Sequence, residues 1–325
     1  MTVNRYLPEG SLYGTAENRE ALSSQASLER AAATGKILEG MAVLCDGEMS
    51  LTVDLGCMKG IIPRGEAVYQ PGGGEARDIA VITRVGKPVC FRVIAIERNS
   101  AGESYAVLSR RAAQAECVRC CLSSLAEGDI IPATVTHIEH FGACVDIGCG
   151  IVSLLSIDCI SVSRISHPSD RLYTGMNLRT VVRSIERDSE GFVSRLYVSH
   201  KELLGTWEEN ASLFSPGQTV SGTVRSIEDY GIFVELTPNL AGLSEYRPGT
   251  EIGDTAAVYI KSIIPERMKV KLVLIDSMGI AVPDRRIKYF VPESVGHIDS
   301  WIYSPPSCEK RIETHFTPAE AEVRA

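Results

Sequence analysis

The sequence lacks the long apolar stretch of a membrane protein and the short motifs of common enzymes. It has no run of about 18 apolar residues, the length that a membrane-spanning helix requires, and no basic-then-apolar leader. A Gly-x-Ser-x-Gly turn, a His-Glu-x-x-His helix and a phosphate-binding loop are also missing. We therefore expect a protein that is not an enzyme, stays out of membranes and uses no cofactor, metal ion or small-molecule substrate.

Positive charge is also scarce. Lys and Arg total 33 against 41 Asp and Glu, which gives a formal net charge of −8. This balance argues against a protein that holds duplex nucleic acid through its phosphates, because such binding needs a basic footprint. Single-strand binding stays open, since stacking of bases on exposed rings supplies much of that affinity.

Cysteine is present, but not in a pattern that indicates disulfides. Ten cysteines in a chain without a secretory leader indicate reduced thiols and a cytoplasmic location. Cys117, Cys120 and Cys121 recur at helical spacing, together with Leu125. A structural zinc site needs four ligands, and no second Cys/His pair stands at the usual spacing. The cluster therefore favours a buried apolar helix face over a metal site.

Aromatic residues make up only 6% of the chain, which also has 28 glycines and 15 prolines, a profile that favours short strands over long helices. The most informative aromatics stand in a repeated phrase. Tyr230-Gly-Ile-Phe-Val follows a strand-like run and a polar turn, and Phe141-Gly-Ala-Cys-Val repeats the pattern upstream. Side chains three apart leave a regular strand on opposite faces, so we expect the glycine to hold a bulge that brings both to one surface.

This phrase resembles the S1 RNA-binding domain, whose wording is aromatic-Gly-Ala-Phe-Val followed by Gly-Leu-Val-His. The resemblance covers residues 37–276 and implies an all-β fold of three tandem five-stranded OB-type barrels with short linker helices. A thin apolar stripe after Thr15 predicts an N-terminal helix, and strand-like pieces predict a β-ribbon-like C-terminal extension. The expected segments are 1–36 for the N-terminal helix, 37–111 for a divergent first barrel, 112–126 for a linker helix, 127–204 for the second barrel, 205–276 for a linker helix and the third barrel, and 277–325 for the extension.

Within this resemblance, a small set of residues is expected to bind RNA. Phe141, Tyr230 and Phe233 supply stacking rings. Asp188 and Arg195 fall on positions that commonly line the RNA face, and Lys269 takes the place of the family's Arg. Four departures each remove an expected contact: Cys144, Ser156, Glu245 and Pro265.

The first barrel has no such rings. Met49 and Thr52 stand where the aromatic pair is expected, which favours a structural or protein-contacting barrel over an RNA reader.

Two further segments carry aromatic residues whose role the sequence leaves open. Trp207 lies on a linker helix, and its neighbours Leu213 and Phe214 favour a core position over base stacking. In the extension, basic and aromatic residues alternate, and they predict either a hairpin packed on the third barrel, which we favour, or a second nucleic-acid surface made of Arg285, Arg286, Lys288, Trp301 and Tyr303.

The resemblance extends to the short ribosomal-protein-S1-like proteins of bacteria. It implies a cytoplasmic protein that binds single-stranded RNA or mRNA, in translation or mRNA handling, with the ribosome as a second expected partner. The alternative is a non-catalytic scaffold whose degenerate barrels dock on the ribosome or on an RNA-processing complex. A third reading is a regulatory subunit of an RNA-processing enzyme.

Overall fold

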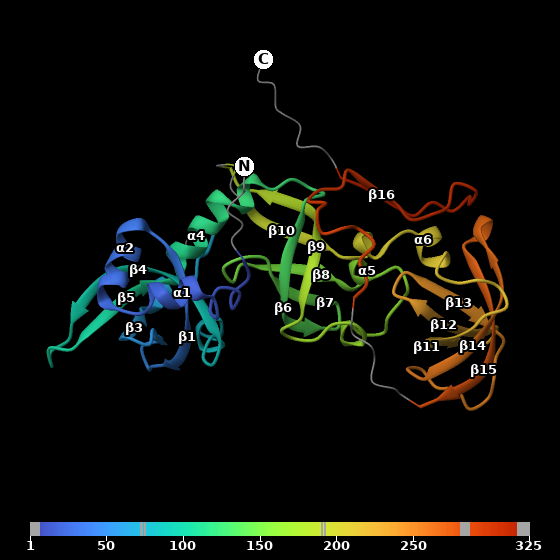
Figure 1. Ribbon diagram of the computed structural model, residues 1–325, viewed down its shortest axis with the longest axis horizontal. Helices are drawn as coiled ribbons and strands as arrows, with labels where there is room; N and C mark the ends of the chain where they lie inside the picture. The colour runs from blue at the N-terminus through green and yellow to red at the C-terminus, as the bar shows by residue number, and fades with distance from the viewer. Residues whose placement is uncertain are drawn as a thin grey trace, which may run out of the picture.

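The computed structural model describes residues 7–316, apart from 72, 73, 75, 190, 192 and 280–286. Three closed five-stranded barrels lie in a row, and the C-terminal segment runs back along barrels 3 and 2 (Figure 1). The all-β fold of three tandem barrels that the sequence predicts is therefore confirmed.

Each barrel has the same construction. The first three strands form an antiparallel meander, the last two form a hairpin, and the third and fifth strands pair in parallel to close the barrel. The strands of barrel 1 are β1 (Ile37–Cys45), β2 (Leu51–Asp54), β3 (Lys59–Ile62), β4 (Pro88–Arg98) and β5 (Ser104–Ser109). Those of barrel 2 are β6 (Ile130–Glu139), β7 (Gly142–Asp146), β8 (Val152–Ser156), β9 (Asn177–Arg187) and β10 (Val193–Ser199). Those of barrel 3 are β11 (Thr219–Glu228), β12 (Gly231–Thr237), β13 (Leu240–Ser244), β14 (Thr255–Ile264) and β15 (Lys269–Met278).

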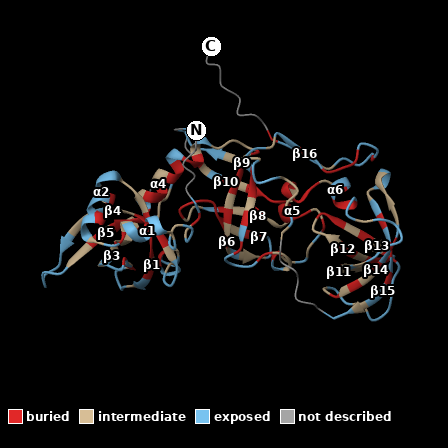
Figure 2. Ribbon diagram, in the orientation of Figure 1, coloured by how far each residue is buried: buried red, intermediate tan, exposed pale blue. Residues whose placement is uncertain are grey.

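The strands bury alternate side chains, as the period of two along a strand requires. On β15, Val270, Leu272 and Leu274 point into the core, while Lys269 and Lys271 are exposed. Buried residues accordingly fill the interior of each barrel (Figure 2). Short helices join or flank the barrels: α3 (Asp78–Ile82), α4 (Arg110–Cys120), α5 (Ile157–Ile160) and α6 (Trp207–Ala211).

The N-terminal segment forms two helices where the sequence suggests one, α1 (Ala16–Ala21) and α2 (Gln25–Thr34). Thr15 caps the first helix and Ser24 the second, each through a hydroxyl that accepts a backbone N–H. The second serine cap therefore starts a new helix at a point where the apolar pattern alone continues.

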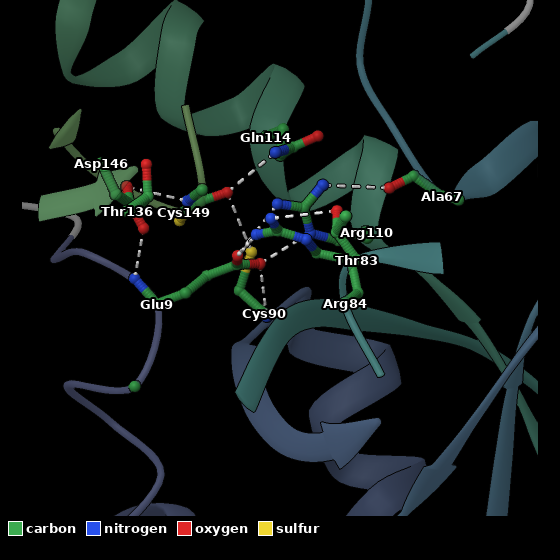
Figure 3. Close-up of polar contacts among 12 residues, drawn as sticks. Glu9, Ala67, Thr83, Arg84, Cys90, Arg110, Gln114, Thr136, Asp146 and Cys149 are labelled. Carbon is green, nitrogen blue, oxygen red and sulfur yellow. Dashed lines mark hydrogen bonds and ion pairs between the residues drawn. The ribbon is translucent and has the colours of Figure 1, made fainter. Parts of the chain in front are cut away.

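Barrels 1 and 2 are joined by a buried polar cluster to which the N-terminal segment contributes Glu9 (Figure 3). Arg110, at the start of α4, donates from Nε and Nη2 to the Glu9 carboxylate at 2.6 and 2.9 Å. The Cys90 N–H of barrel 1 donates to the same carboxylate, and the Glu9 N–H donates to Asp146 Oδ2 of barrel 2. Burial pushes the pKa of Glu9 upward, but Arg110 outweighs it and holds the pKa below its usual range.

The α4 helix also fixes this joint through its buried face. Gln114 receives the Tyr69 N–H from barrel 1 and donates to Cys149 O of barrel 2. Cys117 and Cys121 are buried and Cys120 is exposed, so only two of the three cysteines lie on the packed face. The described residues include no group of three His, Cys, Asp or Glu placed to hold a metal ion.

Barrels 2 and 3 are joined by a second buried ionic cluster. Arg171 donates from Nη1 and Nη2 to the Glu235 carboxylate at 2.8 and 2.5 Å, and Arg225 Nε donates to it at 2.8 Å. Glu235 and Asp146 occupy equivalent places, since each pairs with a threonine of the preceding strand, Thr223 and Thr134 respectively. Each joint therefore uses the same position on the second strand of the later barrel, which is β7 in barrel 2 and β12 in barrel 3.

The C-terminal extension closes the second joint from outside. Its β-ribbon consists of β16 (Ser300–Ile302) and β17 (Glu313–His315). Trp301 and Tyr303 are buried in the core cluster of barrel 3, where Trp207 also lies. The prediction of a core position for Trp207 is thus confirmed, and the burial of Trp301 and Tyr303 contradicts a second nucleic-acid surface built on them. Arg285 and Arg286 lie outside the described residues.

The part of the extension that precedes β16 is tied to barrel 2. The Phe290 N–H donates to Leu203 O, and the Ile298 N–H donates to Gly128 O. Tyr289 connects the two parts through a chain of hydrogen bonds: the Arg179 N–H donates to its oxygen, and its hydroxyl lies 3.3 Å from His200 Nε2. His200 Nδ1 lies 3.1 Å from Ile160 O. A carbonyl can only accept, so His200 carries its proton on Nδ1 and accepts at Nε2 from Tyr289.

This arrangement makes the attachment of the extension sensitive to acid. Burial, with the positive charge of Arg171 assisting, lowers the pKa of His200 from 6.5 to about 4. Unfolded chains take up the proton first as pH falls, so the stability that neutral His200 provides is complete above about pH 6.5 and is lost as pH falls toward 4. We expect a loss of about 3 kcal/mol over this window, measured by denaturant unfolding and by amide exchange in residues 287–316.

The control for this prediction is His200→Asn, whose amide replaces the Nδ1–H donor without titrating. Asp146 and Glu39 have the opposite effect, because burial raises the pKa of each carboxyl to about 7 and their stabilising contribution is lost as pH rises through that value. The informative quantity is therefore the difference in free energy of unfolding between the unsubstituted protein and His200→Asn at each pH. If the free energies of unfolding of the two proteins changed in parallel from pH 4 to 7, His200 would have no part in the acid response.

Candidate nucleic-acid interface

The rings of the repeated phrase lie at the turn between the first two strands of barrels 2 and 3. Tyr230 is 69% exposed and forms an edge-to-face pair with Phe233, with ring centroids 6.1 Å apart. Phe141 is 49% exposed, and its edge-to-face partner is His140 at 5.3 Å. Barrel 3 therefore presents two adjacent aromatic rings, whereas barrel 2 presents one together with an imidazole.

The glycine after each ring has a different role from the one expected. A Cβ on Gly231 would lie 2.3 Å from Ser244 O, and a Cβ on Gly142 would lie 2.4 Å from Leu155 O. The glycine thus lets the third strand approach closely. The bulge lies on the first strand instead, at Arg225 in barrel 3 and at Thr136 in barrel 2.

Strand register places five side chains next to each other across the outside of each barrel, and we call these sets the outer rows. In barrel 3 the row, in the order β11, β12, β13, β15 and β14, is Ser226, Phe233, Leu243, Lys271 and Ser262. In barrel 2 it is His137, Cys144, Leu154, Tyr197 and Ser184. In barrel 1 it is Leu44, Thr52, Ile61, Val107 and Ala95. All fifteen residues are exposed or half-buried, as expected for outward side chains.

The outer row of barrel 3 combines a ring with a cation. Phe233 is separated from Lys271 by Leu243 alone, and Lys269 lies two residues before Lys271 on the same exposed face of β15. The sequence pointed to Lys269, but the register brings Lys271 into the row with Phe233. A half-buried ring two strands away from an exposed ammonium group suits a base and the phosphate next to it.

The outer row of barrel 2 has a different composition. Cys144 provides no ring on β7, but Tyr197 on β10 is half-buried in the same row. Arg195 lies two residues before Tyr197 and is exposed. Asp188, just beyond the end of β9, is exposed as well. Arg195 and Asp188 therefore lie on the surface of barrel 2, and Arg195 is next to the row.

Two of the remaining departures from the expected pattern lie at the ends of third strands, and the other lies between the fourth and fifth strands of barrel 3. Ser156 pairs with Gly142 and donates its hydroxyl to Asp158 at 2.6 Å. Glu245 is exposed just after β13 and adds negative charge at the corresponding corner of barrel 3. Pro265 begins a short 3-10 turn between β14 and β15. Ser156 and Glu245 therefore do not supply the imidazole of the S1 pattern, and Pro265 does not supply its carboxylate.

Barrel 1 has an aliphatic outer row. Leu44 is 53% exposed, and Thr52, Ile61, Val107 and Ala95 are half-buried. The row has neither a ring nor a charge, so it offers no stacking surface and no phosphate contact.

Comparison with known proteins gives one family match and several curated relatives. Residues 124–195, which cover most of barrel 2, match the S1 RNA binding domain. The small ribosomal subunit protein bS1 homolog of Bacillus subtilis (strain 168) is 33% identical over 199 residues, which are 59% of this chain and 48% of that protein. Protein bS1 of Rhizobium meliloti (strain 1021) is 29% identical over 197 residues, 59% of this chain and 32% of that protein.

A longer match joins more of the chain to the same group. Protein bS1 of Neisseria meningitidis serogroup B is 27% identical over 265 residues, 76% of this chain and 44% of that protein. The matched part is less than half the length of each of these relatives.

Among the described residues, no helix is long and apolar enough to cross a membrane.

Proposed function

We propose that this chain, a bS1-like protein with tandem S1-type barrels, binds single-stranded RNA on the outer faces of barrels 2 and 3. The observation that carries the proposal is the ring pair of exposed Tyr230 and half-buried Phe233, with Phe233 in one outer row with Lys271. Stacking accepts any base, because every base has a π-face, and the lysines supply phosphate contacts despite the net negative charge of the chain. Phe141, Arg195 and Asp188 form the corresponding surface of barrel 2, and Lys269 extends that of barrel 3.

The similarity to bS1 proteins supports a finer proposal about context. The relatives are named as components of the small ribosomal subunit. We infer that mRNA is the physiological RNA, that the chain acts in translation or mRNA handling in the cytoplasm, and that the ribosome is a partner. The aliphatic outer row of barrel 1 favours a second role as a protein-contacting module, in keeping with the scaffold alternative.

Removing either ring from barrel 3 is expected to weaken binding. Tyr230→Ala and Phe233→Ala should each cost about 1–3 kcal/mol, the typical value of one base–ring stack. The measurement is fluorescence anisotropy of labelled oligouridine at low and moderate salt. Tyr259→Ala is the matched control, because this tyrosine is 38% exposed on β14 of the same barrel but pairs with Thr219 and Val273, outside the outer row.

Two results would count against RNA reading by barrel 3. One is the absence of binding by the intact chain even at low salt. The other is an equal loss in Tyr259→Ala and Phe233→Ala, since this would indicate a general effect on the barrel rather than a stacking site. The protein-contacting alternative would then be preferred.

A further inference from the structure

The second barrel lacks the β-strand ring that a base would use in barrel 3, yet its outer row still contains a ring. Cys144 and Phe233 occupy equivalent places, since each pairs with a leucine of the third strand, Leu154 and Leu243 respectively. On the other side of that leucine lies Tyr197 in barrel 2 and Lys271 in barrel 3. The ring of the outer row thus stands on the second strand in barrel 3 and on the fifth strand in barrel 2.

We propose that Tyr197 is the strand-borne stacking residue of barrel 2 and receives a base there as Phe233 does in barrel 3. This inference rests on the proposed RNA binding and adds a residue that the S1 resemblance did not indicate. Its place two strands away from Cys144 corresponds to a displacement of about 10 Å across the barrel.

The neighbours of Tyr197 suit this role. Its register partners are Leu154 and Ser184, and all three residues are half-buried on the outside of the barrel. Arg195 lies two residues earlier on the same face, so a cation is next to the ring, as Lys271 is near Phe233. At the far end of the row, His137 is exposed and its Nε2 lies 2.7 Å from Glu139.

The different place of this ring implies that barrels 2 and 3 arrange the bound bases differently. In barrel 3 the two rings contact each other edge to face, so we expect them to stack on neighbouring bases. In barrel 2, Phe141 lies at the β6–β7 turn, outside the outer row, and Tyr197 lies on β10, two strands from Cys144 in the row. We therefore expect the two rings of barrel 2 to stack on different bases.

The test uses the full chain with the barrel 3 site removed, Tyr230→Ala/Phe233→Ala, and labelled oligouridine at low salt. In this background, Tyr197→Ala is expected to weaken binding about tenfold or more, the effect of losing one stack. Tyr197→Phe keeps the ring and should bind as the background does. Val107→Ala, at the same register position of barrel 1, is the matched control and should leave the affinity unchanged.

A row exchange gives a stronger test of position. Cys144→Phe/Tyr197→Lys gives barrel 2 the ring and cation order of barrel 3, and it should restore the affinity that Tyr197→Ala loses. Crosslinking of 4-thiouridine RNA to the background protein should identify the peptide that contains Tyr197.

The outcomes separate this inference from the function on which it rests. If the intact chain does not bind the RNA, both the proposed function and the assignment of Tyr197 are rejected. If it binds and Phe141→Ala weakens the background while Tyr197→Ala does not, only the assignment of Tyr197 is overturned. An equal loss in Tyr197→Phe and Tyr197→Ala would assign the effect to the hydroxyl and reject stacking. Circular dichroism of each variant checks that the barrel remains folded.

Discussion

Arg110→Met is expected to destabilise the joint between barrels 1 and 2 by about 3–5 kcal/mol. Arg110 is 3% exposed and is the main partner of the Glu9 carboxylate, which would keep only the Cys90 N–H and Arg84 at 3.5 Å. An uncompensated buried charge costs far more than the lost hydrogen bonds, so the pKa of Glu9 should rise in the variant. Amide exchange in barrel 1, α4 and the β7–β8 turn measures this opening locally, as suits a chain of several domains.

The adjacent residue supplies the control. Arg111 pairs with Glu66 on the surface, where its side chain is 53% exposed, and Arg111→Met should cost no more than about 1 kcal/mol. The double variant Glu9→Gln/Arg110→Met should recover a large part of the loss, because neither partner is then a buried charge. Equal exchange rates in Arg110→Met and Arg111→Met would show that the cluster does not hold the joint.

Trp207→Ala is expected to destabilise barrel 3 and release the extension, at a cost of about 3–5 kcal/mol. Trp207 is 2% exposed and lies in one core cluster with Leu240, Trp301 and Tyr303. Its removal leaves a cavity where α6, the barrel and the extension meet. The backbone bond from the Trp207 N–H to Tyr303 O, 3.0 Å long, survives the substitution, so the loss reports on packing. Amide exchange in 219–278 and 300–316 is the appropriate measurement.

Leu213→Ala is the matched control, since Leu213 follows the same helix but is 41% exposed and should change stability by about 0.5 kcal/mol or less. Trp207→Phe retains most of the volume and should lose less than Trp207→Ala. If Trp207→Ala and Leu213→Ala behaved alike, the linker tryptophan would have no structural role at this joint.

The barrels could be predicted from the sequence because their signals are local. The turn, the glycine and the alternating strand residues of Tyr230–Leu236 lie within one hairpin, and the same wording returns at Phe141. A parallel pairing is not local. Lys271 joins the row of Phe233 through Leu243 only once β13 and β15 are aligned, so the sequence could point to Lys269 at the start of β15 but not to Lys271 in the row. The place of Tyr197 in the outer row of barrel 2 depends on a parallel pairing in the same way.

The joints were beyond prediction for a related reason. Glu9 and Arg110 are 101 residues apart, and neither is distinguished from the other charged residues of the chain until the fold brings them together. Trp301 and Tyr303 show the converse. They stand in a segment that also contains basic residues, which is equally compatible with a nucleic-acid surface and with a packed ribbon, and only their burial against barrel 3 decides between the two.

The closed joint between barrels 2 and 3 has a consequence for avidity. Tethered binding sites normally gain from a second contact according to the effective concentration that a flexible linker allows. Here the Arg171–Glu235 pair and the extension hold the two outer rows at one separation. A ligand whose unpaired run matches that separation gains the second contact at little entropic cost, and a ligand whose run is too short gains nothing. On the proposed RNA binding, we therefore expect the joint to favour RNA by the length of its single-stranded stretch rather than by its bases.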